Sequence, residues 1–221
     1  TGGELRTANL DAILDSPAAY PCTWNIADPA SNELHMPLNL NQKYKPTNLE
    51  KMDKEDQDHY ATIYEYGCMS CSYADIVAYY TNQKYTILDI FKNGWSDDNG
   101  FAHQPNAVKY GVKFTTKYCS TESAYLAEIK ESIDLGRPAI LHFGDVSGTT
   151  DKTESHYVVA YKYINGCVPT PGKPLSNVYV LDPYNADENS EIGSIRTAYE
   201  AQKASYCGPI DQILLSAPYT S

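Results

Sequence analysis

The 221-residue sequence has no long apolar run and no cluster of basic residues. A membrane-spanning helix needs about 20 consecutive apolar residues, whereas the apolar runs here are short, such as YVVAY at 157–161. The formal net charge of −11 opposes binding to nucleic acid and to an anionic membrane surface. We therefore expect neither a membrane span nor a nucleic-acid partner.

Cysteine is also scarce for a chain of this length. Six cysteines are too few for a fold held together by disulfides, and a chain this long can bury a core without them. The Cys-x-x-Cys at 68–71 has no second Cys-x-x-Cys and no His-x-x-x-His to complete a zinc site. We expect no metal and no other cofactor.

Phenylalanine and tryptophan are rare, with 4 and 2 residues, whereas tyrosine occurs 20 times. Acidic, tyrosine-rich chains are typical of secreted or cell-surface bacterial proteins, and we expect that location here. The sequence begins with Thr1 and shows no signal peptide, as expected of a mature or trimmed product.

Apolar residues recur three and four apart after Cys68, which predicts a buried helix that begins near this residue, with Gly67 in the preceding turn. Further helices are predicted at about 86–93, 104–110 and 121–135. Each of these three segments is followed by a glycine that can end a helix: Gly94, Gly111 and Gly136.

Strands are predicted in the second half of the chain, where valine, isoleucine and tyrosine gather. Helices first and strands second favour an α+β fold with an antiparallel sheet behind a helical half. We expect an N-terminal arm, residues 1–50, packed on a domain of residues 51–221, with the charged segment 51–60 as a solvated loop or helix face. The predicted strands are 138–143, 156–164, 177–182 and 212–216.

Three side chains could form a nucleophilic site. A reactive cysteine needs a lowered pKa, which the start of a helix supplies in part, together with a histidine and a third group that orients the histidine. Cys68 lies at a predicted helix start, His156 begins one predicted strand and Asp182 ends another. Neighbouring strands would place His156 beside Asp182.

Five short segments, in order, resemble motifs of the papain-like peptidases related to those that cut double-glycine leaders from bacteriocins. The segment at 67–74 resembles the motif GCGPTSLA of that family, the segment at 155–161 resembles GHYVVV, and the segment at 178–183 resembles VYVNDP. Two further segments between them also resemble family signatures. In this chain the five read GCMSCSYA (67–74), KYGV (109–112), GRPAI (136–140), SHYVVAY (155–161) and VYVLDP (178–183).

The resemblance implies a papain-like fold and a cysteine peptidase, with Cys68 as nucleophile, His156 as base and Asp182 as the residue that orients the base. It also implies a peptide or protein substrate, cleaved at a peptide or isopeptide bond through a thioester. The family uses a glutamine upstream of the cysteine to stabilise the oxyanion. Gln57 and Gln42 are the candidates here, and neither lies in a matching motif.

Several alternatives stay open from the sequence. Cys71 is a rival nucleophile, because Cys-Met-Ser-Cys also resembles the Cys-Gly-Ser-Cys of papain, in which the second cysteine reacts. A dithiol oxidoreductase would want a strand before its Cys-x-x-Cys, and the charged residues 51–66 do not predict one. An acyltransferase, a peptidoglycan amidase or an inactive peptidase-like binding module on the same fold would carry similar residues. His142, on a predicted strand, is interpreted as structural.

Overall fold

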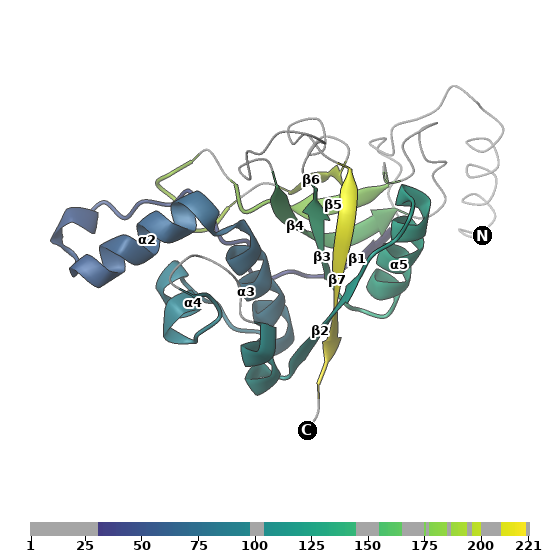
Figure 1. Cartoon of the computed structure of the whole chain (residues 1–221), viewed down its shortest axis with the longest axis horizontal. Coiled ribbons are helices and arrows are strands. Elements are labelled where there is room, and N and C mark those ends of the chain that lie inside the picture. Colours follow the sequence, from purple (N-terminus) through teal and green to yellow (C-terminus); the bar gives the residue numbers. More distant parts are fainter. Residues whose placement is uncertain are drawn as a thin grey trace, which may run out of the picture.

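The computed structural model combines a helical half with an antiparallel sheet (Figure 1). Three of the six cysteines (Cys22, Cys167 and Cys207) and His103 lie outside the described residues. The residues that the structure describes are 31–97, 104–144, 155–164, 175, 177–184, 187–193, 196–199 and 209–219.

The helical half surrounds one buried helix, α3 (Cys68–Thr81), which was predicted to begin near Cys68. Nine consecutive residues of α3, from Ser70 to Ala78, are buried. Each large apolar side chain that is fully buried stabilises the fold by roughly 1.5–3 kcal/mol. This burial fixes α3 in place and, with it, the position of its first residue.

Three segments pack against α3: α2 (Lys54–Tyr66), α4 (Ile87–Lys92) and the 3-10 segment η2 (Gln104–Tyr110). Helix α5 (Glu122–Asp134) packs instead against the sheet, and a short 3-10 segment, η1 (Leu49–Lys51), precedes α2.

The predicted helix ends are confirmed. Gly94, Gly111 and Gly136 all have positive φ, between 66° and 75°, and Thr121 caps α5 by accepting a hydrogen bond from the Ala124 amide. One expectation needs correction. The segment predicted as a helix at 104–110 is a 3-10 helix, a form common in short connections such as this one, which leads straight into a strand.

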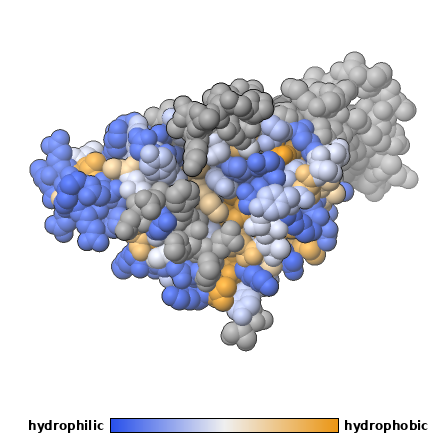
Figure 2. All heavy atoms as spheres, viewed as in Figure 1, coloured by the Kyte–Doolittle hydropathy of each residue, from blue (hydrophilic) through white to orange (hydrophobic). Residues whose placement is uncertain are grey.

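Residues 54–66 form a full helix, α2. Of the two expectations for the charged segment 51–60, a solvated loop or a helix face, the structure therefore bears out the helix. Tyr60 and Ile63 of α2 are buried, so packing stabilises a helix that its charged sequence does not reveal. Figure 2 shows the hydrophilic surface of the molecule at the left end of the view, where Figure 1 places α2.

The sheet follows the order β2-β7-β3-β4-β5-β6, with β1 paired to β4, and every described pair is antiparallel. In Figure 1, α3 lies to the left of this sheet and α5 to the right. Strand β2 departs from the predicted sequence order, in which all helices precede all strands, because it lies between helices along the chain. The strands are β1 (Ser31–Glu33), β2 (Val112–Lys117), β3 (Ala139–Phe143), β4 (His156–Ile164), β5 (Val178–Leu181), β6 (Arg196–Ala198) and β7 (Ile210–Pro218).

Residues 31–50 are held closely against the rest of the fold. Strand β1 pairs with β4, and Leu40 forms an isolated bridge with Ile192. Four apolar side chains of this segment are in the hydrophobic core: Leu34, Met36, Leu38 and Leu40. The division of the chain at residue 50 stays a prediction.

None of the helices in the described ranges has the length and apolar character that crossing a membrane requires.

Candidate active site

Gly67 joins two consecutive helices and fixes where Cys68 lies. It ends α2, with its amide donating to the Ile63 carbonyl, and its own carbonyl accepts from the Cys71 amide in the first turn of α3. A Cβ at position 67 would lie 2.5 Å from the Ile63 carbonyl oxygen, closer than real contacts allow. Only glycine therefore lets α3 begin against the end of α2, with Cys68 as its first residue.

The two cysteines of the Cys-x-x-Cys have different surroundings. Cys68 is partly exposed, whereas Cys71 is fully buried in the core. Burial, followed by the nearby Asp75, raises the pKa of the Cys71 thiol well above its usual value. Cys71 is therefore a poor nucleophile, because the reactive form is the thiolate. Neither cysteine forms a disulfide in the described part of the chain.

Strand pairing brings His156 to Asp182. His156 is the first residue of β4, and Asp182 directly follows β5, whose last residue, Leu181, pairs with Val159 of β4. His156 Nε2 lies 2.7 Å from Asp182 Oδ1, and both side chains are almost fully buried. Because Asp182 occupies Nε2, Nδ1 is the ring nitrogen available to a nucleophile.

The predicted nucleophile, Cys68, hydrogen-bonds with the His156 ring through its side chain. Burial alone would lower the pKa of His156, but the hydrogen bonds with Asp182 and Cys68 outweigh it and raise this pKa to about 9. At neutral pH the imidazolium form of His156 is therefore favoured. The structure thus brings together the three residues that the sequence singled out.

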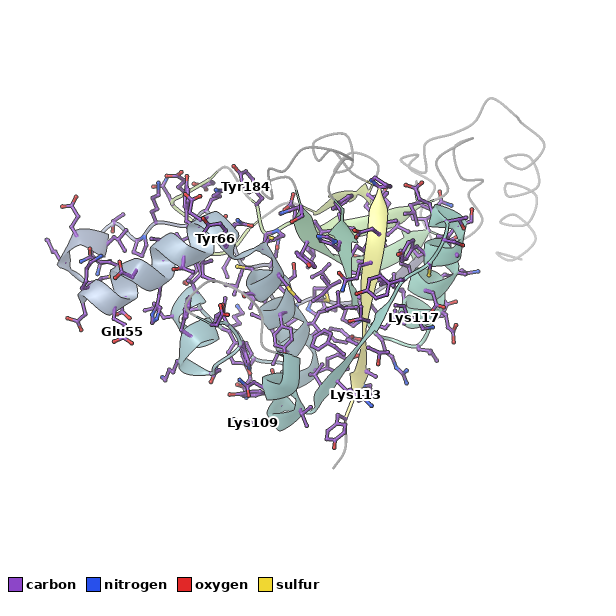
Figure 3. All side chains as sticks on the ribbon, viewed as in Figure 1. Glu55, Tyr66, Lys109, Lys113, Lys117 and Tyr184 are labelled. Carbon is purple, nitrogen blue, oxygen red and sulfur yellow. The ribbon has the colours of Figure 1, made fainter. Side chains whose placement is uncertain are left out.

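Asp182 is itself held in place. The backbone amide of Tyr184 donates to Asp182 Oδ1 at 2.7 Å, and the Tyr184 ring stands edge-on to the His156 ring, with centroids 6.3 Å apart. Figure 3 shows Tyr184 and Tyr66 near the N-terminal end of α3. Tyr184 therefore covers one side of the His156–Asp182 pair.

Gln42 is the candidate that the sequence could not separate from Gln57. Its amide nitrogen contacts the carbonyl of Tyr64, four residues before Cys68, at 3.4 Å, and its backbone amide donates to Pro183, directly after Asp182. Its side-chain oxygen is buried and has no hydrogen-bond partner among the described residues. Gln57, by contrast, bonds to the Met52 carbonyl near the start of α2. Gln42 therefore borders the site, and Gln57 belongs to the far end of α2.

Lys43 adds a positive charge to the same side of the site. Its Nζ lies 3.9 Å from the centroid of the Tyr64 ring and 4.5 Å from that of the Tyr184 ring, and it donates to the Tyr64 carbonyl at 2.9 Å. Such cation–π contacts contribute about 0.5–1 kcal/mol each at exposed sites. Lys43 thereby links the end of α2 to the Tyr184 segment.

The remaining histidines of the described chain do not join this group. His59 stacks on Phe91, with ring centroids 3.9 Å apart, and His142 Nδ1 lies 2.6 Å from Asp211 Oδ1. No cluster of three or more His, Cys, Asp or Glu side chains within the described ranges is arranged to hold a metal ion.

A scan against protein-family models matches residues 39–207 to the Peptidase_C39 like family. The chain belongs to this family. The match covers most of the chain and includes Gln42, Cys68, His156 and Asp182. Membership confirms the predicted relationship and, with the helical half and antiparallel sheet, the α+β papain-like fold.

Membership in the Peptidase_C39 like family also indicates a cysteine peptidase-type function. A search of the curated proteins found no match. The individual roles of Cys68, His156 and Asp182 stay predictions.

Proposed function

We propose that the protein is a cysteine peptidase that hydrolyses a peptide or isopeptide bond through a thioester on Cys68. The observation that carries the proposal is the His156 ring, which bonds to Asp182 at 2.7 Å through Nε2 and to the Cys68 thiol. A nucleophile, a base and an orienting carboxylate in this relation are what thiol-based amide cleavage requires.

In the first half of the reaction, the Cys68 thiolate attacks the substrate carbonyl, and the His156 imidazolium protonates the leaving amine as the C–N bond breaks. The products of this half are a free amine and a thioester. In the second half, neutral His156 takes a proton from water, which attacks the thioester and releases a carboxylic acid. The thiolate and imidazolium are then restored.

Gln42 and the backbone amide of Cys68 are the donors that we assign to the oxyanion. The side-chain amide of Gln42 contacts the Tyr64 carbonyl, and its backbone amide donates to the Pro183 carbonyl. Gln42 therefore lies between the segments that carry the nucleophile and the orienting acid. A donor aimed at developing charge lowers the barrier more than it strengthens substrate binding. Asp182 holds the ring of His156 so that Nδ1 faces the Cys68 sulfur.

The test uses the variants Cys68→Ala, His156→Ala and Asp182→Asn on a mixture of synthetic peptides, with cleavage read by mass spectrometry. The first two should abolish turnover because the pair acts as a unit. Asp182→Asn should retain more turnover than either of these variants, because the nucleophile and the base remain. Cys119→Ala is the matched control, since Cys119 is also partly exposed but lies outside the site. Turnover that survives Cys68→Ala, or that a metal chelator removes, would refute the proposal.

A further inference from the structure

Strand β7 carries an irregularity beside the candidate active site. His142 of β3 pairs with Gln212, whereas the next residue, Phe143, pairs with Ile210, so Asp211 is an extra residue without a partner in the ladder. A β-bulge of this kind turns a side chain away from its regular direction, and bulges are common next to active sites. Here the turned side chain is a carboxylate.

The bulge gives Asp211 a defined position. His142 Nδ1 lies 2.6 Å from its Oδ1, and the buried Tyr125 donates its hydroxyl to the Asp211 backbone carbonyl. Its other oxygen, Oδ2, would lie 2.4 Å from a Cβ at Gly144, so only glycine leaves room for the carboxylate there. The bulge, His142, Tyr125 and the space at Gly144 together therefore place this one group.

Asp211 is nevertheless open to solvent. Its side chain is 52% exposed, against 13% for His142, and among the described residues no lysine or arginine forms an ion pair with it. The nearby Lys117 pairs instead with Glu128 at 2.6 Å. The carboxylate is held in place but keeps a face available to a ligand.

Tyr157 links the His142–Asp211 pair to His156. It directly follows His156, pairs with His142 across the sheet, and its ring lies 4.3 Å from the His142 ring. His156 pairs with Phe143 of β3, and Phe143 in turn pairs with Ile210 of β7, the residue before Asp211. Asp211 therefore lies two strands away from His156, at the same level of the sheet.

A further aromatic side chain borders the same place. Tyr118 directly follows β2, whose last residue pairs with Ile213 of β7. It is 76% exposed. A carboxylate beside an exposed tyrosine ring suits a lysine or arginine side chain, because an ion pair and a cation–π contact can form together.

We propose that Asp211, positioned by His142 and flanked by Tyr157 and Tyr118, forms a subsite for a cationic side chain of the peptide substrate. Neighbouring side chains of an extended peptide alternate in direction, and those two apart stand about 7 Å from each other on one face. The cation therefore belongs to a residue one or two positions from the scissile bond. The inference rests on the proposed function, and Asp211 lies beyond the residues matched to the family.

The test begins with the same peptide mixture, which should show lysine or arginine enriched within two residues of the cut. Two peptides are then compared that differ only at the enriched position, where one has lysine and the other norleucine. The measured quantity is the kcat/KM of the lysine peptide divided by that of the norleucine peptide. Because partly exposed ion pairs contribute on the order of 1 kcal/mol, this ratio should be about fivefold. Asp211→Asn should reduce it to about one without lowering turnover of the norleucine peptide, and Asp211→Lys should favour a glutamate peptide.

Asp58→Asn is the matched control, since Asp58 is also exposed and pairs with Lys54 on α2. It should leave the ratio unchanged. His142→Gln should lower the ratio while leaving the norleucine peptide unaffected, as expected of a positioning residue. A ratio that survives Asp211→Asn, or cleavage sites without basic residues in a Cys68-dependent digest, would overturn the subsite but not the peptidase.

A second measurement applies if the protein cleaves none of the peptides in the mixture. Peptidyl acyloxymethyl ketones with lysine or norleucine should label Cys68, the lysine form about fivefold faster, and Asp211→Asn should remove the difference. Equal rates refute the subsite alone. Absence of any labelling at Cys68 refutes the proposed function and the subsite together.

Discussion

At the scale of single residues, Gln42 offers the sharpest separation of chemistry from binding. If it donates to the oxyanion, Gln42→Ala should lower kcat by about 100-fold or more with a smaller change in KM. Alkylation of Cys68 by iodoacetamide forms no oxyanion, so its rate should be unchanged. Steady-state kinetics and an alkylation time course measure the two effects.

Gln57→Ala is the matched control, because Gln57 bonds to Met52 at the start of α2 and should leave kcat unaltered. If Gln42→Ala slowed alkylation as much as turnover, Gln42 would act by holding the site together.

The two cysteines of the Cys-x-x-Cys give a second residue-scale prediction. Iodoacetamide at pH 7 should modify Cys68 first, because the imidazolium of His156 lies beside its sulfur. Cys71 should react only after unfolding, since burial raises its pKa. Peptide mapping after timed alkylation measures both rates, and preferential modification of Cys71 in the folded protein would reverse the choice of nucleophile.

At the scale of elements, the close junction of α2 and α3 predicts that a side chain at position 67 lowers both stability and activity. Gly67→Ala would place a Cβ 2.5 Å from the Ile63 carbonyl, so the helices must shift, at a cost of roughly 1–3 kcal/mol of unfolding free energy. Because Cys68 is the next residue, activity should fall as well. Denaturant unfolding and kcat/KM measure the two losses.

Gly111→Ala is the comparison for Gly67→Ala. Gly111 has a φ of +75°, but a Cβ there would meet its nearest atom, the Tyr219 carbonyl oxygen, at an ordinary 3.6 Å. Its substitution should reduce stability through backbone strain and leave kcat/KM of the folded protein unchanged. If both variants lost activity equally, the geometry of the α2–α3 junction would not be what sets the position of Cys68.

The sequence predicts those elements whose signals are local. The start of α3, the cap of α5 and the glycine stops all depend on residues a few positions apart, and the structure contains each of them. Strand β2 was not predicted, because the feature that stabilises it is pairing with β7 near the far end of the chain. For a similar reason the sequence left open whether the charged segment 51–60 is a loop or a helix face, since the core on which α2 packs forms only in the fold.

The same distinction applies to the candidate site. Cys68, His156 and Asp182 lie in recognisable motifs, whereas helix α2 separates Gln42 from Cys68 in the sequence and hides their relation. His142 was interpreted as structural, yet its partner Asp211 is 69 positions away and is brought near by a bulge that no local pattern shows.

For the whole molecule, several buried groups with raised pKa values act on stability in the same direction. The pKa of His156 rises from 6.5 to about 9, that of the Cys71 thiol lies well above 9.0, and that of Tyr157 rises to about 12. In each case the folded state holds its proton at a pH where the unfolded chain has lost it. The free energy of unfolding therefore falls as the pH rises.

The pH window follows from these values. The contribution of His156 is fully present below pH 6.5 and is lost as the pH rises through about 9, a loss of up to about 3 kcal/mol. Cys71 extends the fall above about pH 9, and the net charge of −11 adds self-repulsion in the same direction. We therefore expect greater stability near pH 6 than at pH 9, measured by denaturant unfolding at intervals between them.

His156→Gln should flatten the curve of unfolding free energy between pH 6.5 and 9 while retaining the fall above pH 9, whereas Cys71→Ala should do the reverse. A wild-type protein equally stable at pH 6 and pH 9 would show that the buried His156–Asp182 pair does not hold its extra proton.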